Sequence, residues 1–69
     1  MRISARNQLA GTVTAIKLGT VNAEIEIAVM PEVKLVSVIT RSSAEALGLQ
    51  PGSPVYAIIK SSEVIIGVC

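Results

Sequence analysis

Three short clusters of polar side chains carry the groups in this sequence that could do chemistry. They lie at residues 4–8 (SARNQ), 40–43 (TRSS) and 60–62 (KSS), and each combines a cationic side chain with hydroxyl groups. Hydroxyl donors, backbone N–H groups, a guanidinium and an ammonium together suit a small oxyanion. None of the clusters supplies a carboxylate or an imidazole, so they offer no ligand set for a metal cation.

Each cluster also has an ordinary structural interpretation. An arginine such as Arg6 is usually a solvated surface charge, and Lys60 at a strand end can protect that edge from aggregation. The serines of the second cluster suit the N-terminus of a helix, and those of the third suit a hairpin turn. Residue types and spacing alone leave both interpretations open.

The composition argues against several other functions. Six Lys and Arg residues against five acids give a net charge of +1 with no basic run, whereas nucleic acid is bound by clustered cations. One aromatic side chain leaves no stacking platform for single strands. The sequence has no His, no Asp and one Cys, so it offers no acid–base pair and no transition-metal site. We therefore expect no enzyme activity, no cation site, no organic cofactor and no nucleic-acid partner.

The cellular location is predicted from hydropathy and cysteine usage. The longest uninterrupted apolar run, residues 55–59, is far too short to span a bilayer. Polar residues at 4–8 interrupt any signal-peptide core after Arg2. The one cysteine, Cys69, cannot form an internal disulfide, which favours a reducing compartment. We expect a cytoplasmic protein without membrane association.

Strands are the elements that must position the three clusters. Apolar residues make up 51% of the sequence, and they include nine Val and nine Ile, β-branched types that favour sheet. Alternation of apolar and polar residues predicts the first two strands, and apolar runs bounded by turn residues predict the others. The predicted strands cover residues 9–15, 21–29, 33–39, 55–59 and 63–68.

Between the third and fourth strands the period changes. Ser42, followed three residues later by Glu45, is a capping-box pattern, and Gly48 stands where a helix would end, so residues 43–47 are predicted to form a short helix. The resulting order predicts an all-β fold, a small five-stranded OB-like β-barrel with one short helix between strands three and four, in one domain of residues 1–69. A domain this small and this apolar should bury surface against copies of itself.

The three clusters also carry a resemblance to a known family. Ser-Ala-Arg-Asn-Gln at positions 4–8 resembles the opening signature of the molbindin (Mop) family of TOBE-type molybdate-binding domains. Residues 38–40, Ser43 and residues 47–49 resemble the helix region of that family, and residues 56–64 resemble its closing hairpin. The likeness spans essentially the whole chain. It departs at residues 29–32, Val-Met-Pro-Glu, where many relatives have a glycine-rich hairpin.

The resemblance implies a function. Family members form OB-like barrels that assemble as homohexamers, trimers of dimers, and bind molybdate or tungstate at subunit interfaces. We therefore expect a role in intracellular molybdenum storage and homeostasis. Two alternatives stay open: an OB-fold module that binds oligonucleotides or protein partners, and an oligomer whose clusters are only caps and surface charges. By position, the resemblance implies oxyanion contacts from Ser4, Ala5 (through its backbone), Arg6, Thr40, Ser43, Lys60 and Ser61.

Overall fold

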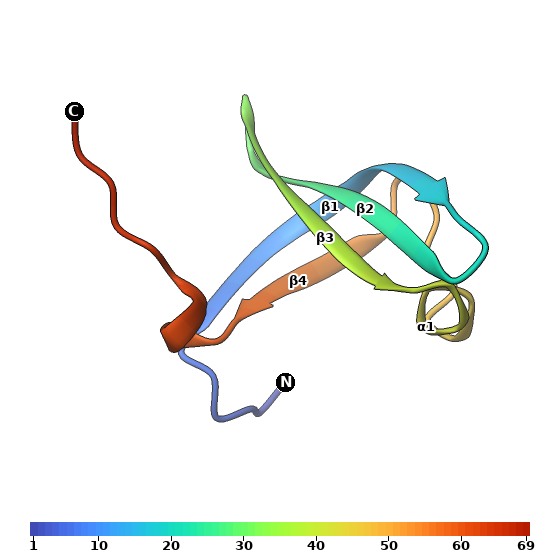
Figure 1. Cartoon of the computed structure of the whole chain (residues 1–69), viewed down its shortest axis with the longest axis horizontal. Coiled ribbons are helices and arrows are strands. Elements are labelled where there is room, and N and C mark those ends of the chain that lie inside the picture. The colour runs from blue at the N-terminus through green and yellow to red at the C-terminus, as the bar shows by residue number, and fades with distance from the viewer.

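Four antiparallel strands form one sheet in the order β3-β2-β1-β4 (Figure 1). The computed structural model describes all 69 residues. Its strands are β1 (Asn7–Leu18), β2 (Asn22–Met30), β3 (Val33–Thr40) and β4 (Pro54–Ile59). The helix α1 (Arg41–Ala46) joins β3 to β4, and a 3-10 turn, η1 (Ser61–Glu63), follows β4. The predicted mostly-β architecture, with one short helix after the third strand, is therefore confirmed.

A bulge in β1 changes which side chains face the core. The ladder with β2 pairs Val13 with Ile27 and then Ala15 with Glu26, so Thr14 is the extra residue. An extra residue shifts the alternation of faces by one position. Beyond the bulge Ile16 packs against the core, whereas Ala15 is exposed. The strict alternation predicted for residues 9–15 does not allow for this bulge.

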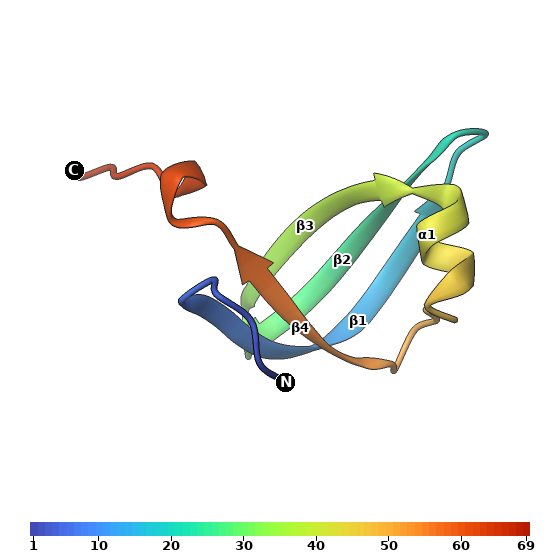
Figure 2. The same cartoon turned by 90° about the horizontal axis from the view of Figure 1, so that it is seen from below.

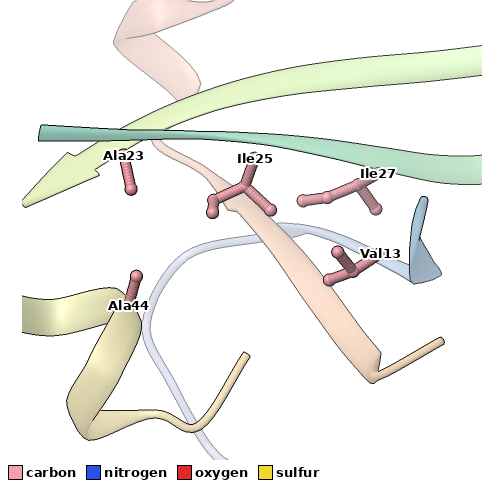
Figure 3. Close-up of a cluster of buried hydrophobic side chains, with 5 residues drawn as sticks. All are labelled: Val13, Ala23, Ile25, Ile27 and Ala44. Atoms are coloured by element: carbon pink, nitrogen blue, oxygen red, sulfur yellow. The ribbon is translucent and has the colours of Figure 1, made fainter. Parts of the chain in front are cut away.

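The core is small and lies between the concave face of the sheet and α1. Only five side chains are buried, and Figure 3 shows them grouped between β1, β2 and the helix. Burial at this scale stabilises a chain weakly, because about 25 cal/mol is gained per Å² of apolar surface removed from water. The chain therefore leaves much of its apolar surface uncovered. The buried residues are Val13, Ala23, Ile25, Ile27 and Ala44.

The helix begins earlier than the sequence predicted, and a different residue caps it. Thr40 is the N-cap: its Oγ1 accepts a hydrogen bond from the Ser43 N–H at 3.1 Å. The expected capping box of Ser42 with Glu45 is wrong, because Glu45 instead accepts from the Arg41 Nε at 3.1 Å across one helical turn. Gly48 ends the helix as predicted, with φ +64°. No helix of this chain is long and apolar enough to cross a membrane.

The predicted fifth strand and the closed barrel are absent from the single chain. No ladder joins the two edge strands, β3 and β4. After β4 the chain makes the turn η1, in which the Val64 N–H reaches the Ser61 carbonyl at 3.4 Å, and then runs away from the sheet (Figures 1 and 2). Composition favoured a strand over residues 63–68 because β propensity reports a fit to a half-buried pleated surface. This chain provides no such surface along that path.

The β2–β3 turn places a non-glycine residue in the left-handed region. Pro31 and Glu32 form the two-residue loop, and Glu32 has φ +68°. Proline followed by a residue with positive φ is typical of a type II turn, in which the second central position favours glycine. This is the hairpin at which the sequence departs from the glycine-rich pattern of the family it resembles. The chain adopts a tight turn here without the glycine.

Candidate functional site

The first and third polar clusters meet at one end of the sheet. The β1–β4 ladder pairs Asn7 with Ile59, which places the residues just before β1 beside those just after β4. The Asn7 side-chain amide also donates to the Ile59 carbonyl at 3.2 Å. Arg6 and Lys60, the next residues outward on the two strands, are therefore held side by side. We call this group, residues 4–6 with 60–61, the amino-end group.

A local hydrogen bond shapes the segment before β1. The Gln8 side chain donates to the Ala5 carbonyl at 2.6 Å, which turns the chain just ahead of the strand. Ala5 is half-buried, whereas Ser4 and Arg6 are exposed. With its carbonyl occupied, the Ala5 peptide is fixed in orientation, and backbone groups fixed in this way are suited to binding an anion.

The second cluster forms a separate group around the start of α1. Thr40 Oγ1 lies 2.7 Å from Ser43 Oγ, to which it donates, and 3.3 Å from Ser42 Oγ. Because Thr40 supplies its hydrogen to Ser43, the Ser43 hydroxyl hydrogen is free to donate elsewhere. The neighbouring Arg41 is engaged with Glu45 at 3.1 Å and with the Gly19 carbonyl at 3.4 Å. We call Thr40 and Ser43 the helix-end group.

The two groups lie at opposite ends of the sheet. Thr40 pairs with Asn22, the first residue of β2, and the next residue of β2 pairs with Leu18 at the end of β1. The helix-end group therefore lies near the end of β1. The amino-end group lies near the start of β1. At about 3.3 Å per residue, β1 extends roughly 36 Å along its path between these ends. Figure 1 shows η1 beside the start of β1 and α1 at the other end. One chain does not bring the seven predicted residues together.

The amino-end group carries two cations that no acid of the chain neutralises. The three ion pairs are Lys17 with Glu24, Lys34 with Glu26 and Arg41 with Glu45. Arg6 and Lys60 belong to none of them, and both are exposed. Two adjacent cations with hydroxyl groups beside them make a locally positive, donor-rich surface, which attracts a small dianion.

Sequence reasoning overlooked the residues that position this group. Asn7 and Gln8 belong to the SARNQ motif, but their residue types alone indicate no role in the site. The structure shows that their amides fix the two backbone segments that carry Arg6 and Lys60. The sequence feature that could have indicated this role is the pair of adjacent amide side chains at the point where a strand begins.

Comparison with protein families gives one match that spans most of the chain. Residues 3–66 match the family model described as the TOBE domain. The chain is 46% identical to molybdenum-pterin-binding protein 3 of Clostridium pasteurianum, covering 96% of this chain and 97% of that protein. It is 50% identical to the molybdenum-pterin-binding protein MopA of Rhodobacter capsulatus, but it spans only 25% of MopA.

A solved structure shares the fold. The cytoplasmic molybdate-binding protein ModG, crystallised with molybdate bound, superposes with a TM-score of 0.94 at 45% sequence identity. The alignment covers all of this chain and 49% of ModG. The four-stranded sheet with its short helix is therefore an arrangement found in a molybdate-binding protein.

Proposed function

This chain belongs to the TOBE-domain family, and from that premise we propose that it binds molybdate, or the nearly isosteric tungstate, between copies of itself. The observation that carries the proposal is the amino-end group, in which Arg6 and Lys60 lie side by side without a neutralising acid. Relatives whose names specify molybdenum or molybdate, alignable over nearly the whole chain, support the choice of anion.

The residue types fit the chemistry of the anion. Molybdate is a tetrahedral dianion, so its oxygens need several donors and partial neutralisation of charge. Arg6 offers a fork of N–H groups and Lys60 a compact charge, while Ser4, Ser61 and the Ala5 backbone add neutral donors. Removing a dianion from water costs several kcal/mol unless it is fully paired. The amino-end group of one chain is exposed to water, so by itself it supplies only part of the donors that a buried dianion needs.

A second copy would supply the remaining donors. Thr40 and Ser43 lie at the far end of the same chain, so they contact the anion held by the amino-end group only if another copy brings them there. We propose that each site combines the amino-end group of one copy with the helix-end group of another. The closed assembly that we infer is a homohexamer, a trimer of dimers, as the resemblance implies.

Selectivity would follow from cavity size and from the donor set. Molybdate has longer metal–oxygen bonds than the S–O bonds of sulfate, so a cavity shaped for molybdate holds sulfate loosely. The site groups contain no carboxylate or imidazole, so the proton of hydrogen phosphate would find only hydroxyl oxygens, which are weaker acceptors. A pterin ring would need an aromatic surface for stacking, and Tyr56 is the one aromatic residue of this chain. We therefore favour the inorganic oxyanion as the ligand.

The biological role that we infer is storage and buffering of the anion. The function would belong in the cytoplasm, where ModG is described as acting. No pair of groups in the two site groups could serve as acid and base, so we infer binding without catalysis. An oligonucleotide-binding role has less support, because the net charge is only +1 and aromatic residues make up 1% of the chain.

Isothermal titration calorimetry tests this proposal. Molybdate added to micromolar protein should give saturable heat, and sulfate at the same concentration should give far less. Displacement of bound molybdate by tungstate would show that the two anions share a site. Absence of heat with molybdate, or equal affinity for sulfate, would contradict the proposed function.

A further inference from the structure

An ion pair lies beside the helix-end group, and neither of its residues belongs to the two site groups. The Arg41 Nε donates to a Glu45 carboxylate oxygen at 3.1 Å across one turn of α1. A second N–H of the guanidinium, on Nη1, reaches the Gly19 carbonyl at 3.4 Å. The Arg41 backbone N–H also donates to the Val21 carbonyl at 2.7 Å. Arg41 is therefore held against the β1–β2 turn, next to Thr40 in the chain.

The guanidinium of Arg41 is engaged with groups other than the helix-end hydroxyls. Thr40 Oγ1 and Ser43 Oγ bond to each other at 2.7 Å, whereas the guanidinium bonds to Glu45 and Gly19. Residues two apart on a helix do not face each other. A helix with its side chains is only about 10–12 Å across, so the charge of Arg41 lies within about 12 Å of an anion bound at Ser43. At that distance the charge acts through space, without contact.

The charges around the proposed site match the charge of the anion only because Glu45 is present. Arg6 and Lys60 contribute two positive charges without a carboxylate partner, and molybdate carries two negative charges. Arg41 would add a third positive charge, which the Glu45 carboxylate cancels. A surplus charge enclosed between copies would be unfavourable, because removing an uncompensated charge from water has a large free-energy cost.

We propose that the Arg41–Glu45 pair sets the charge preference of the oxyanion site, so that the site favours a doubly charged over a singly charged tetrahedral oxyanion. The inference rests on the proposed function, since it concerns the same site. Neither residue contacts the anion, and both act through their charges. With the pair neutral, the site keeps the two positive charges of Arg6 and Lys60, which balance a dianion but leave one charge uncompensated beside a monoanion.

Removal of either charge of the pair should leave the fold intact. The side chains of Arg41 and Glu45 are 45% and 63% exposed, and exposed ion pairs contribute little to stability. Glutamine is neutral, and it favours helix about as well as arginine and glutamate do. Arg41→Gln and Glu45→Gln therefore change the charge near the site by one unit in opposite directions, and the double variant restores the original net charge.

Calorimetric titration of these variants tests the inference, with molybdate and with perrhenate, a tetrahedral oxyanion of similar size that carries one negative charge. A unit charge about 12 Å from a dianion changes its affinity about threefold even at the dielectric constant of water. At an ionic strength of about 0.01 M, where screening is weak, Glu45→Gln should bind molybdate about threefold more tightly and Arg41→Gln about threefold more weakly. The double variant should bind molybdate as the unaltered protein does.

The ratio of the molybdate affinity to the perrhenate affinity separates an electrostatic role from a structural one. A unit charge acts about twice as strongly on a dianion as on a monoanion, so this ratio should be about threefold higher in Glu45→Gln than in Arg41→Gln. A structural role of the pair would weaken the binding of both anions in both variants and leave the ratio unchanged. Equal ratios in the two variants would overturn the inference and leave the proposed function in place, whereas absence of molybdate binding by the unaltered protein would overturn both.

Discussion

Lys60 and Arg6 stand together because two amide side chains fix the backbone around them. The Asn7 amide binds the Ile59 carbonyl and the Gln8 amide binds the Ala5 carbonyl. Neither cation has a carboxylate partner within the chain, so their charges are available to a ligand. At the scale of single residues, the proposed site is two free cations on a fixed backbone.

Replacing Lys60→Ala should weaken molybdate binding without loss of the fold. Removing one partner of a desolvated charge pair costs about 2 kcal/mol or more, which corresponds to a loss of affinity of at least about 30-fold. Calorimetry of the variant measures this. The matched control is Lys17→Ala, an exposed lysine on β1 whose loss should leave the affinity unchanged. Equal affinities of the two variants would remove Lys60 from the site.

Glu26 gives the chain a measurable pH dependence away from the site. Its carboxylate accepts from the Thr14 hydroxyl at 2.8 Å and lies 3.2 Å from the Lys34 ammonium. The Thr14 hydrogen bond, followed by Lys34, lowers the pKa of Glu26 below its ordinary value of 4.5. A depressed pKa stabilises the folded state at pH values above 4.5, and this stabilisation is lost as pH falls through the folded-state pKa.

The variant Thr14→Val tests that coupling. Without the hydroxyl donor, the pKa of Glu26 should rise toward its ordinary value, which an NMR titration of the side-chain carboxyl measures directly. The stability difference between the two proteins should shrink as the pH is lowered below about 4. A Glu26 pKa that is the same in both proteins would show that the hydrogen bond in the structure has no electrostatic effect.

At the scale of elements, the turn between β2 and β3 stores strain. A non-glycine residue in the left-handed region costs about 1–2 kcal/mol, and Glu32 has φ +68° there. Glycine relieves this strain but loses more conformational entropy on folding, which offsets part of the gain. Glu32→Gly should therefore raise stability by up to about 1 kcal/mol, or a few degrees in Tm. Thermal unfolding checks this prediction, and a lower Tm would contradict it.

Gly11 shows how tightly β1 and β2 are packed. A Cβ at Gly11 would lie 2.7 Å from the Ala28 carbonyl oxygen and 2.8 Å from a methyl carbon of Ile27. The absence of a side chain lets the two strands approach closely where β1 bends toward its bulge at Thr14. The two site groups lie on either side of this bend, toward the two ends of β1.

The sequence predicted the elements more completely than their assembly. Alternation located β2, with Ala23, Ile25 and Ile27 all buried, because period-two patterns arise from a single sheet face. It did not detect the bulge at Thr14, and it could not tell that residues 63–68 lack a partner within the chain. A local sequence pattern indicates which side chains are suited to burial. It does not indicate which segment packs against them, because that depends on the tertiary fold.

The sequence proposes the candidate site as a set of residues but cannot place those residues in space. Resemblance supplied all seven residues, and the ladder between Asn7 and Ile59 explains why residues 4–6 and 60–61 are adjacent. No pattern in the sequence indicated that Thr40 and Ser43 lie at the opposite end of the sheet. The separation is evident only from how the strands pair. It is the reason that the proposed site needs a second copy of the chain.

At the scale of the whole molecule, the isolated chain is incomplete in two independent respects. Its surface of 5532 Å² is about a third larger than a compact monomer of its mass would expose, and its two site groups do not meet. A partner copy would resolve both, by covering apolar surface and by bringing the helix-end group to the amino-end group. Ligand that binds only the assembled form would then stabilise the assembly by mass action.

A crystal structure of the protein grown with molybdate, with molybdenum located by its anomalous scattering, tests the central claim most directly. Our account places the metal at a seam between copies, with its oxygens within hydrogen-bonding distance of Arg6 and Lys60 from one copy and of Thr40 or Ser43 from another. Molybdenum held by residues of one chain alone, or found away from both groups, would contradict it.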